Sequence, residues 1–349
     1  MSEHPPRLLA LATAVPQHTL HQREVMAAGQ QLFGDAFADI DRLLPIYANA
    51  GIESRRSCVP LEWYLEDHGF AERNDLFLRH ASDLLSEAAD ACLARAGLRH
   101  EDVDAIVAVS TSGIATPSLD ALVMESRPFR RDTQRLPVFG LGCAGGVVGL
   151  SRAADMARSR PGSKVLYLCV ELCGLTFRHD DRGKSNFVAT ALFGDGAAAA
   201  LITCAAEGGP ALMASGEHTW KDTLDVMGWQ VCDDGFGVLF SRDIPTIVRK
   251  DYRAACDGFL ARNDLDLAGF DAILCHPGGA KVIAALEEVF AMPSAAMGHA
   301  RDILRSHGNM SAATILFVLE RALAQEPPGH WLLSSLGPGF TAAFLTLEP

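Results

Sequence analysis

The sequence lacks the features that mark several large classes of protein. No two of its nine cysteines have C-x-x-C spacing, so no metal site is expected, and an odd, scattered set is typical of a reducing compartment. The start of the sequence shows no basic stretch followed by an apolar run, and no segment reaches the roughly 20 apolar residues of a membrane span. The net charge of −13 argues against a nucleic-acid partner. We therefore expect a cytoplasmic globular protein with no membrane span.

The stretch Val138–Gly146 predicts a short buried strand that runs into a glycine-rich turn and then into a helix ending near Arg158. Cys143 lies at this junction, where free backbone N–H groups and the helix dipole favour a negative charge. Such a position lowers the pKa of a cysteine, and the neighbouring glycines leave room for a substrate to approach the sulfur. We therefore interpret Cys143 as a nucleophile; the alternative is a small buried cysteine that only packs.

The second half of the sequence repeats the first in four ordered features, of which the first comprises two segments. The offset is 166 or 167 residues for the first three features and shorter for the last. The matched segments are 93–95 with 260–262, 103–106 with 270–273, 142–143 with 308–309, 165–169 with 331–335, and 193–196 with 336–339. A repeated strand–helix unit predicts an α/β fold whose sheets are covered by helices. We place the two duplicated halves at residues 1–205 and 206–349.

The duplication also brings chemical groups together. If the halves are related by an approximate twofold axis, Cys143 and Asn309 begin equivalent helices and face each other across the join. His276 lies at the end of a repeated strand, where ligands commonly bind in α/β sheets, and Cys275 should point to the opposite face. His307, two residues before Asn309, is the alternative base.

Five motifs follow one another along the chain: GLGCAGG at 140–146, ALFGDGAAA at 191–199, CHPGG at 275–279, GNMSAA at 308–313 and GPGF at 337–340. In these motifs the chain resembles the type III polyketide synthases, the chalcone and stilbene synthase family of the thiolase-like superfamily. The resemblance implies a five-layered αβαβα fold, a homodimer, acyl-CoA and malonyl-CoA as substrates, and no metal or redox cofactor. It also implies that Cys143 carries the acyl group and that His276 and Asn309 complete a catalytic triad.

The same resemblance assigns further residues. Phe193 matches an aromatic gatekeeper, although core packing before a glycine turn is an equal interpretation, and the neighbouring Asp195 reads as a turn residue. Residues implied to shape the substrate pocket are Thr111, Cys173, Thr176, Val238, Gly337, Pro338, Gly339 and Phe340. Residues expected near the CoA arm are Arg55, Gly278, Gly279 and Lys281, although chalcone synthases have alanine at the last position and Arg55 with Arg56 also fits a solvated surface. Thr116 matches the residue that crosses the dimer interface, which is methionine in plant enzymes.

Val238 stands where chalcone synthases have a phenylalanine facing the starter pocket, and Cys173 and Thr176 are also small. Smaller side chains leave a longer apolar tunnel, so we predict a medium- or long-chain fatty acyl starter, a few malonyl extensions, and closure to an alkylpyrone or alkylresorcinol. The alternatives are a malonyl-only or aromatic-starter polyketide synthase, a single condensation like that of ketoacyl-ACP synthase III, and a non-catalytic acyl-binding scaffold. The intact triad argues against the scaffold, and the CHPGG and GPGF motifs favour a polyketide synthase.

Overall fold

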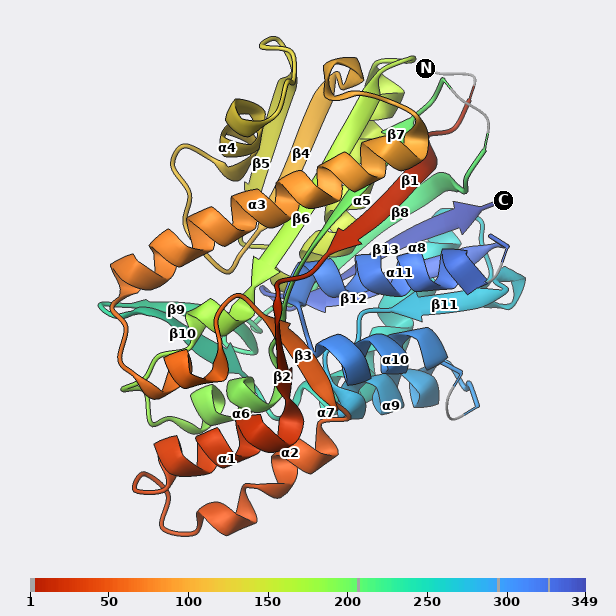
Figure 1. The fold of residues 1–349 in the computed structure, drawn as a ribbon. Coiled ribbons are helices and arrows are strands. Elements are labelled where there is room, and N and C mark those ends of the chain that lie inside the picture. Colours follow the sequence, from red (N-terminus) through yellow and green to blue (C-terminus); the bar gives the residue numbers. More distant parts are fainter. Residues whose placement is uncertain (1–3, 206–207, 294–295, 326) are drawn as a thin grey trace.

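The computed structural model describes residues 4–205, 208–293, 296–325 and 327–349. The strands of its main sheet are β1 (Arg7–Ala14), β4 (Ala105–Ser110), β5 (Gln134–Phe139), β6 (Lys164–Leu172), β7 (Asp195–Thr203), β8 (Ala211–Thr219), β11 (Ala272–Cys275), β12 (Trp331–Gly337) and β13 (Thr341–Glu348). They are ordered β11-β12-β13-β8-β1-β7-β6-β4-β5 (Figure 1). Two small antiparallel sheets pair β2 (His18–His21) with β3 (Ser54–Ser57), and β9 (Met227–Cys232) with β10 (Gly235–Phe240).

The helices are α1 (Gln22–Phe33), α2 (Pro45–Asn49), α3 (Phe70–Ala96), α4 (Leu119–Ser126), α5 (Gly145–Ser159), α6 (Lys184–Leu192), α7 (Ile244–Ile247), α8 (Arg253–Arg262), α9 (Ala280–Val289), α10 (Gly298–His307) and α11 (Thr314–Gln325). None of the helices in the ranges described above is long and apolar enough to cross a bilayer.

The predicted duplication is visible in the strand pairing. In the first half β4 pairs with β6 in parallel, and β6–β7 and β7–β1 are antiparallel. In the second half β11–β12 is parallel, and β12–β13 and β13–β8 are antiparallel. The half-sheets meet where Arg7 of β1 pairs with Ala211 of β8. The boundary placed between residues 205 and 206 falls at residues 206–207, which lie outside the described part of the chain.

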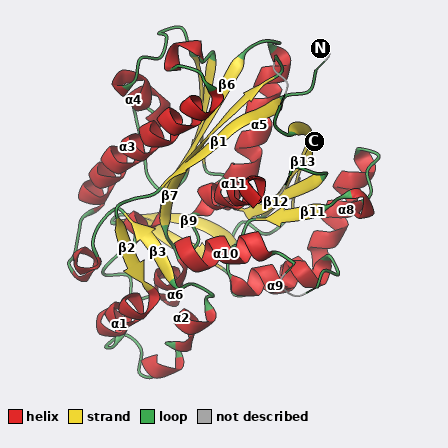
Figure 2. Ribbon diagram, turned by 45° about the vertical axis from the view of Figure 1, so that its right-hand side comes forward, coloured by secondary structure: helices red, strands yellow, loops and turns green. Residues whose placement is uncertain are grey.

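Helices and half-sheets alternate in five layers, as predicted (Figure 2). Helix α3 covers the outer face of β1, β6 and β7, and buries an apolar stripe that includes Phe77, Ala81 and Leu85. Helices α5 and α11 lie between the two half-sheets and contact both, and α8 covers β8 and β13 from the other side. All nine residues of β7 are buried, because this strand is covered by α3 on one face and by α5 on the other.

Strand β5 departs from the prediction that the strand before Cys143 is buried. It is the last strand of the sheet, so one of its edges has no neighbour within the described chain. Its side chains are largely exposed, with Phe139 at 59% and Leu136 at 37%. An apolar edge of this kind is a surface that can pair with another strand.

Candidate active site

Cys143 lies in a short 3-10 turn, Gly142–Ala144, that leads directly into α5. Glycine is needed at the start of this turn because Gly142 has a φ of +47°, and a Cβ atom there would lie 2.6 Å from Pro338 Cδ. On the other side, a Cβ on Gly337 would lie 2.7 Å from the Ala144 nitrogen. The two glycines let the 337–340 loop pack closely against the cysteine turn, which fixes the position of the sulfur.

His276 and Asn309 reach the same region from the second half of the chain. His276 follows β11, and its backbone N–H donates to the Ser334 carbonyl at 2.8 Å, which extends the pairing with β12 by one residue. The backbone of Asn309 pairs with the segment around Phe193: its N–H donates to Leu192 O at 2.8 Å, and its carbonyl accepts from Gly194 N–H at 3.0 Å. Asn309 and the gatekeeper position are therefore held side by side.

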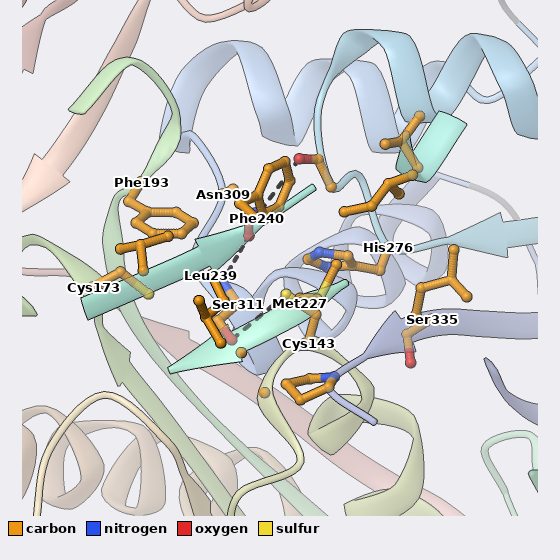
Figure 3. Close-up of a pocket in the computed structure, with 18 of the residues that line it drawn as sticks. Cys143, Cys173, Phe193, Met227, Leu239, Phe240, His276, Asn309, Ser311 and Ser335 are labelled. Carbon is orange, nitrogen blue, oxygen red and sulfur yellow. Dashed lines mark hydrogen bonds between the residues drawn. The ribbon is translucent and has the colours of Figure 1, made fainter. Parts of the chain in front are cut away.

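The side chains of Cys143, His276 and Asn309 open onto one cavity (Figure 3). Asn309 Oδ1 accepts from Ser311 N–H at 2.8 Å and Nδ2 donates to Gly278 O at 3.4 Å, so the amide is oriented by protein groups on both sides. The Cys143 thiol donates to Ser311 Oγ at 3.6 Å. Both ring nitrogens of the buried His276 lack a hydrogen-bond partner among the described residues, which leaves them free to bond a substrate.

Burial sets the protonation of the resting pair. Loss of hydration raises the pKa of Cys143 to about 12, against the smaller lowering effect of the Ser311 hydrogen bond, and the Glu171 carboxylate raises it further. Burial also lowers the pKa of His276 to about 3. The sequence-based expectation of a thiol acidified by a helix start is therefore wrong for this structure, because desolvation of the sulfur outweighs the helix end. Both shifts favour the neutral forms of the resting pair, a thiol and an imidazole.

A buried carboxylate supports the cysteine turn from behind, and sequence reasoning missed it. Glu171 of β6 is fully buried, and its Oε2 accepts from the N–H groups of Thr111 and Ser112, each at 3.0 Å, and from Ser112 Oγ at 2.6 Å. Thr111 Oγ1 in turn accepts from the Gly142 N–H at 3.0 Å. Burial raises the pKa of Glu171 despite these hydrogen bonds. The signal available in the sequence was a single glutamate in the otherwise apolar strand 165–172.

A second, mainly apolar cavity lies next to the first. Cys173, Phe193 and Val238 line both cavities and so form the partition between them. Thr176 lines the second cavity, together with apolar side chains from α1 such as Val25 and Leu32. The predicted small residues thus do lie beside additional apolar space.

Trp229 is a further cavity residue that the sequence analysis did not single out. It is the cross-strand partner of Val238 in the β9–β10 hairpin, its indole N–H donates to Thr111 O at 3.1 Å, and its ring centre lies 6.2 Å from that of Phe193. The aromatic bulk that is missing at Val238 is therefore present on the neighbouring strand. Trp229 lines the catalytic cavity but not the second one, whereas Val238 lines both.

Several predicted site residues have other roles. Thr111 lines neither of the two cavities, because its hydrogen bonds hold it behind the cysteine turn. Of the 337–340 loop only Pro338 reaches the catalytic cavity; Gly337 and Gly339 shape the backbone, with φ +78° at Gly339, and Phe340 is fully buried against Trp220.

Arg55 is not available to a CoA phosphate, and it is not on a solvated surface either. It is 3% exposed, and its guanidinium donates to the carbonyl oxygens of Thr190, Ala191 and Phe193 and to the Gln22 side chain. Burial lowers the pKa of Arg55 to about 10. The side chain fixes the end of α6 and thereby the gatekeeper segment.

The remaining candidates are placed as follows. Gly278 lines the catalytic cavity, Gly279 precedes α9, and Lys281 is exposed on the first turn of that helix. Thr116 is exposed in the loop before α4. His307, the alternative base, lines a separate groove and bonds Ser306 Oγ through Nδ1 at 2.8 Å.

Two neighbours of the catalytic residues also have structural positions. Cys275 points away from the catalytic cavity, as expected from strand alternation, and lines another depression. Asp195 is buried at the start of β7, where it accepts from Cys58 N–H at 2.9 Å and Gly174 N–H at 2.8 Å. Burial raises its pKa to about 6.

Family models and individual relatives both show similarity to chalcone and stilbene synthases and related enzymes. A model of the N-terminal domain of chalcone and stilbene synthases matches residues 64–206, and a model of their C-terminal domain matches residues 211–347. A putative chalcone synthase of Bacillus subtilis (strain 168) is 38% identical, covering 97% of this chain and 97% of the relative. The 1,3,6,8-tetrahydroxynaphthalene synthase of Streptomyces peucetius subsp. caesius is 36% identical, covering 97% and 92%.

Solved structures agree in fold. The crystal structure of 1,3,6,8-tetrahydroxynaphthalene synthase from Streptomyces coelicolor A3(2), a bacterial type III polyketide synthase, superposes with a TM-score of 0.92 at 27% identity, covering 98% of each chain. The crystal structure of PKS-I from the brown alga Ectocarpus siliculosus superposes with a TM-score of 0.89 at 26% identity, covering 99% of this chain and 98% of that one.

Proposed function

The chain belongs to the chalcone and stilbene synthase family of type III polyketide synthases, which are acyltransferases, and on that premise we propose that its starter is a medium- or long-chain fatty acyl-CoA. A few units from malonyl-CoA then extend the chain, and closure gives an alkylpyrone or alkylresorcinol. The observation that carries this proposal is the second apolar cavity, separated from Cys143 only by the partition of Cys173, Phe193 and Val238.

The loading step follows from the neutral resting pair. His276 takes the proton of the Cys143 thiol as the sulfur attacks the thioester carbonyl of the starter. A new C–S bond forms, the bond from the carbonyl carbon to CoA sulfur breaks, and the CoA thiolate leaves with the proton from His276. Splitting the transfer through an acyl-cysteine replaces one difficult step by two easier ones.

The extension step uses the same groups as hydrogen-bond donors. Malonyl-CoA loses carbon dioxide and leaves an enolate, whose negative oxygen is stabilised by an N–H of His276 and by Asn309 Nδ2. One such fixed donor is typically worth about 3–4 kcal/mol in the transition state. The enolate carbon attacks the acyl-cysteine carbonyl, a C–C bond forms, the C–S bond breaks, and the Cys143 thiolate is released. Phe193 supplies an apolar wall that favours neutral carbon dioxide over the carboxylate.

The mainly apolar lining of the second cavity suits an acyl tail. Each methylene transferred from water into apolar surroundings contributes about 0.8 kcal/mol, so the cavity favours long chains over short ones. The polar groups on its wall, such as Asp195 and Arg55, are largely engaged by backbone partners.

A panel of starter acyl-CoAs tests the proposal. The enzyme is incubated with malonyl-CoA and each starter from C4 to C18, together with an aromatic starter and with malonyl-CoA alone, and products are identified by mass spectrometry. We expect kcat/KM to rise with chain length between C6 and C12 and the products to be alkylpyrones or alkylresorcinols. Preference for the aromatic starter or for malonyl-CoA alone would contradict the proposal, and dependence on an acyl carrier protein would favour the ketoacyl-ACP synthase alternative.

We also propose that the protein is a homodimer formed through the edge of β5. The exposed side chains of Leu136 and Phe139 lie on this strand, and Ile114, 47% exposed, lies in the same loop as Thr116. Antiparallel pairing of β5 with the same strand of a second protomer would give hydrogen-bond partners to the backbone groups of this edge and would cover these apolar side chains. Sedimentation of the wild type as a monomer at micromolar concentration would contradict this arrangement.

A further inference from the structure

The roof of the catalytic cavity is a separate element, the β9–β10 hairpin, which belongs to neither half of the nine-stranded sheet (Figure 1). Six of its residues line the cavity: Met227, Gly228, Trp229, Val238, Leu239 and Phe240. The bulkiest of them, Trp229, pairs across the hairpin with Val238. Both members of this pair line the cavity onto which Cys143 opens.

The tip of the hairpin is fastened to the other half of the protein by an ion pair. Asp234 lies in the turn, and its carboxylate receives two hydrogen bonds from Arg178, from Nε at 2.8 Å and from Nη2 at 2.7 Å. Such bidentate pairs define geometry as well as adding energy. Arg178 is itself held by Asp181 at 2.9 Å, and its side chain is only 15% exposed. The pair raises the pKa of Arg178 and lowers that of Asp234.

A second arginine supports the same turn. Arg73 of α3 donates to the backbone carbonyl of Asp234 and, at 2.5 Å, to that of Phe177, the residue before Arg178. The tip is thus tied to the segment that carries Cys173 and Thr176, which line the second cavity. Closer to the middle of the hairpin, the Trp229 indole bonds Thr111 O and Phe236 packs edge-on against Phe70 at 5.4 Å.

We propose that Arg178 is a positioning residue for chain extension: by holding Asp234 it fixes the height of the Trp229–Val238 pair and so limits the number of malonyl units added. Trp229 and Val238 form the fourth register pair from the turn, with Cys232–Gly235 the first, so a displacement of the tip is transmitted along a continuous ladder. The role depends on the polyketide synthase activity proposed above, but it does not depend on which starter is used.

The test uses two neighbouring aspartates of the same turn. Asp234→Asn removes one charge of the ion pair, and Asp233→Asn makes the same chemical change at an exposed side chain with no ion pair or hydrogen bond in the described structure. Each protein is given malonyl-CoA and any starter that the wild type accepts. The readouts are the ratio of products by number of extensions, the rate of carbon dioxide release, and the thermal midpoint.

For Asp234→Asn we expect the ratio of longer to shorter products to change by about two- to fivefold, the size of effect that exposed or half-exposed ion pairs produce. Acyl-enzyme formation should stay within twofold of wild type, and Asp233→Asn should keep the wild-type ratio.

An unchanged product ratio in Asp234→Asn, or an equal change in Asp233→Asn, would overturn the role of Arg178 while leaving the proposed function intact. A wild-type protein that forms acyl-enzyme but extends no starter would refute the proposed function, and with it this role. Loss of thermal stability in Asp234→Asn with no change in product ratio would make the ion pair purely structural, which also contradicts the proposal.

Discussion

Replacing Val238 by phenylalanine tests whether the acyl tail passes from the catalytic cavity into the second one. Val238 contacts both cavities, so the added ring enters the space between Cys143 and the chamber lined by α1 rather than the packed core. A twelve-carbon chain places about eight more methylenes beyond this partition than a four-carbon chain does. At about 0.8 kcal/mol for each methylene, this is an upper limit of roughly 6 kcal/mol of binding free energy. Even half of that corresponds to about a 100-fold change in kcat/KM.

The assay compares kcat/KM for C4-CoA and C12-CoA in wild type, Val238→Phe and the matched control Val231→Phe. Val231 is on the same hairpin but is 76% exposed and lines neither of the two cavities, so its replacement should have no effect. We expect Val238→Phe to lose about 100-fold on C12-CoA and less than fivefold on C4-CoA. Retention of the wild-type C12 to C4 ratio in Val238→Phe would refute the argument that the tail occupies the second cavity.

Three further outcomes follow from the site. The rate of Cys143 alkylation by iodoacetamide should rise about tenfold per pH unit between pH 6 and 9, because its raised pKa keeps it a thiol there; a rate independent of pH would show a thiolate–imidazolium pair at rest. Asn309→Ala should slow carbon dioxide release from malonyl-CoA by about 10²–10³-fold while Cys143 is still acylated within tenfold of wild type, and equal losses in both steps would contradict the donor role. Gly142→Ala should cost about 1–3 kcal/mol of stability, measured by denaturant unfolding, because of its positive φ and the nearby Pro338, whereas Gly298→Ala, with open space around it, should be close to neutral.

Much of the architecture could be predicted because it depends on local sequence patterns and on an internal sequence repeat. The repeated segment 165–169 and the helix after Cys143 were predicted from the sequence, and they lie in β6 and α5. The internal repeat predicted which strands are equivalent. In agreement with it, β4, β6 and β7 pair with one another in the same pattern as β11, β12 and β13 do in the second half. The same repeat brought Cys143 and Asn309 to one cavity, although the 3-10 turn begins at Gly142 in one half and only at Ser311 in the other.

The predictions that were wrong concerned properties that depend on the three-dimensional environment of a side chain rather than on its neighbours in the sequence. The helix start suggested an acidic thiol, but the pKa of Cys143 is governed by how much water the folded cavity excludes. Arg55 looked like a phosphate ligand because nothing in the sequence reveals that three backbone carbonyls surround its guanidinium. Strand β5 was apolar enough to be taken for a buried strand, but it is the edge of the sheet.

Trp229 shows a different kind of limit. At position 238 the chain has valine where chalcone synthases have phenylalanine, and the smaller side chain suggested a larger substrate cavity. The cross-strand partner that returns aromatic bulk to the cavity is nine residues away, and only the register of β9 and β10 identifies it. Both members of a cross-strand pair contribute to the shape of this cavity, so the effect of a smaller residue on one strand depends on its partner on the other strand.

The central claim is that Cys143 carries the acyl chain within reach of His276 and Asn309, and intact-protein mass spectrometry tests it most directly. Wild-type protein mixed with a twelve-carbon acyl-CoA, without malonyl-CoA, should gain the mass of one acyl group per chain, and peptide mapping should place it on Cys143. Cys143→Ala should gain none, and added malonyl-CoA should remove the acyl group from the wild type as product is released. An acyl group on another of the nine cysteines, or product formation at the wild-type rate by Cys143→Ala, would contradict the account.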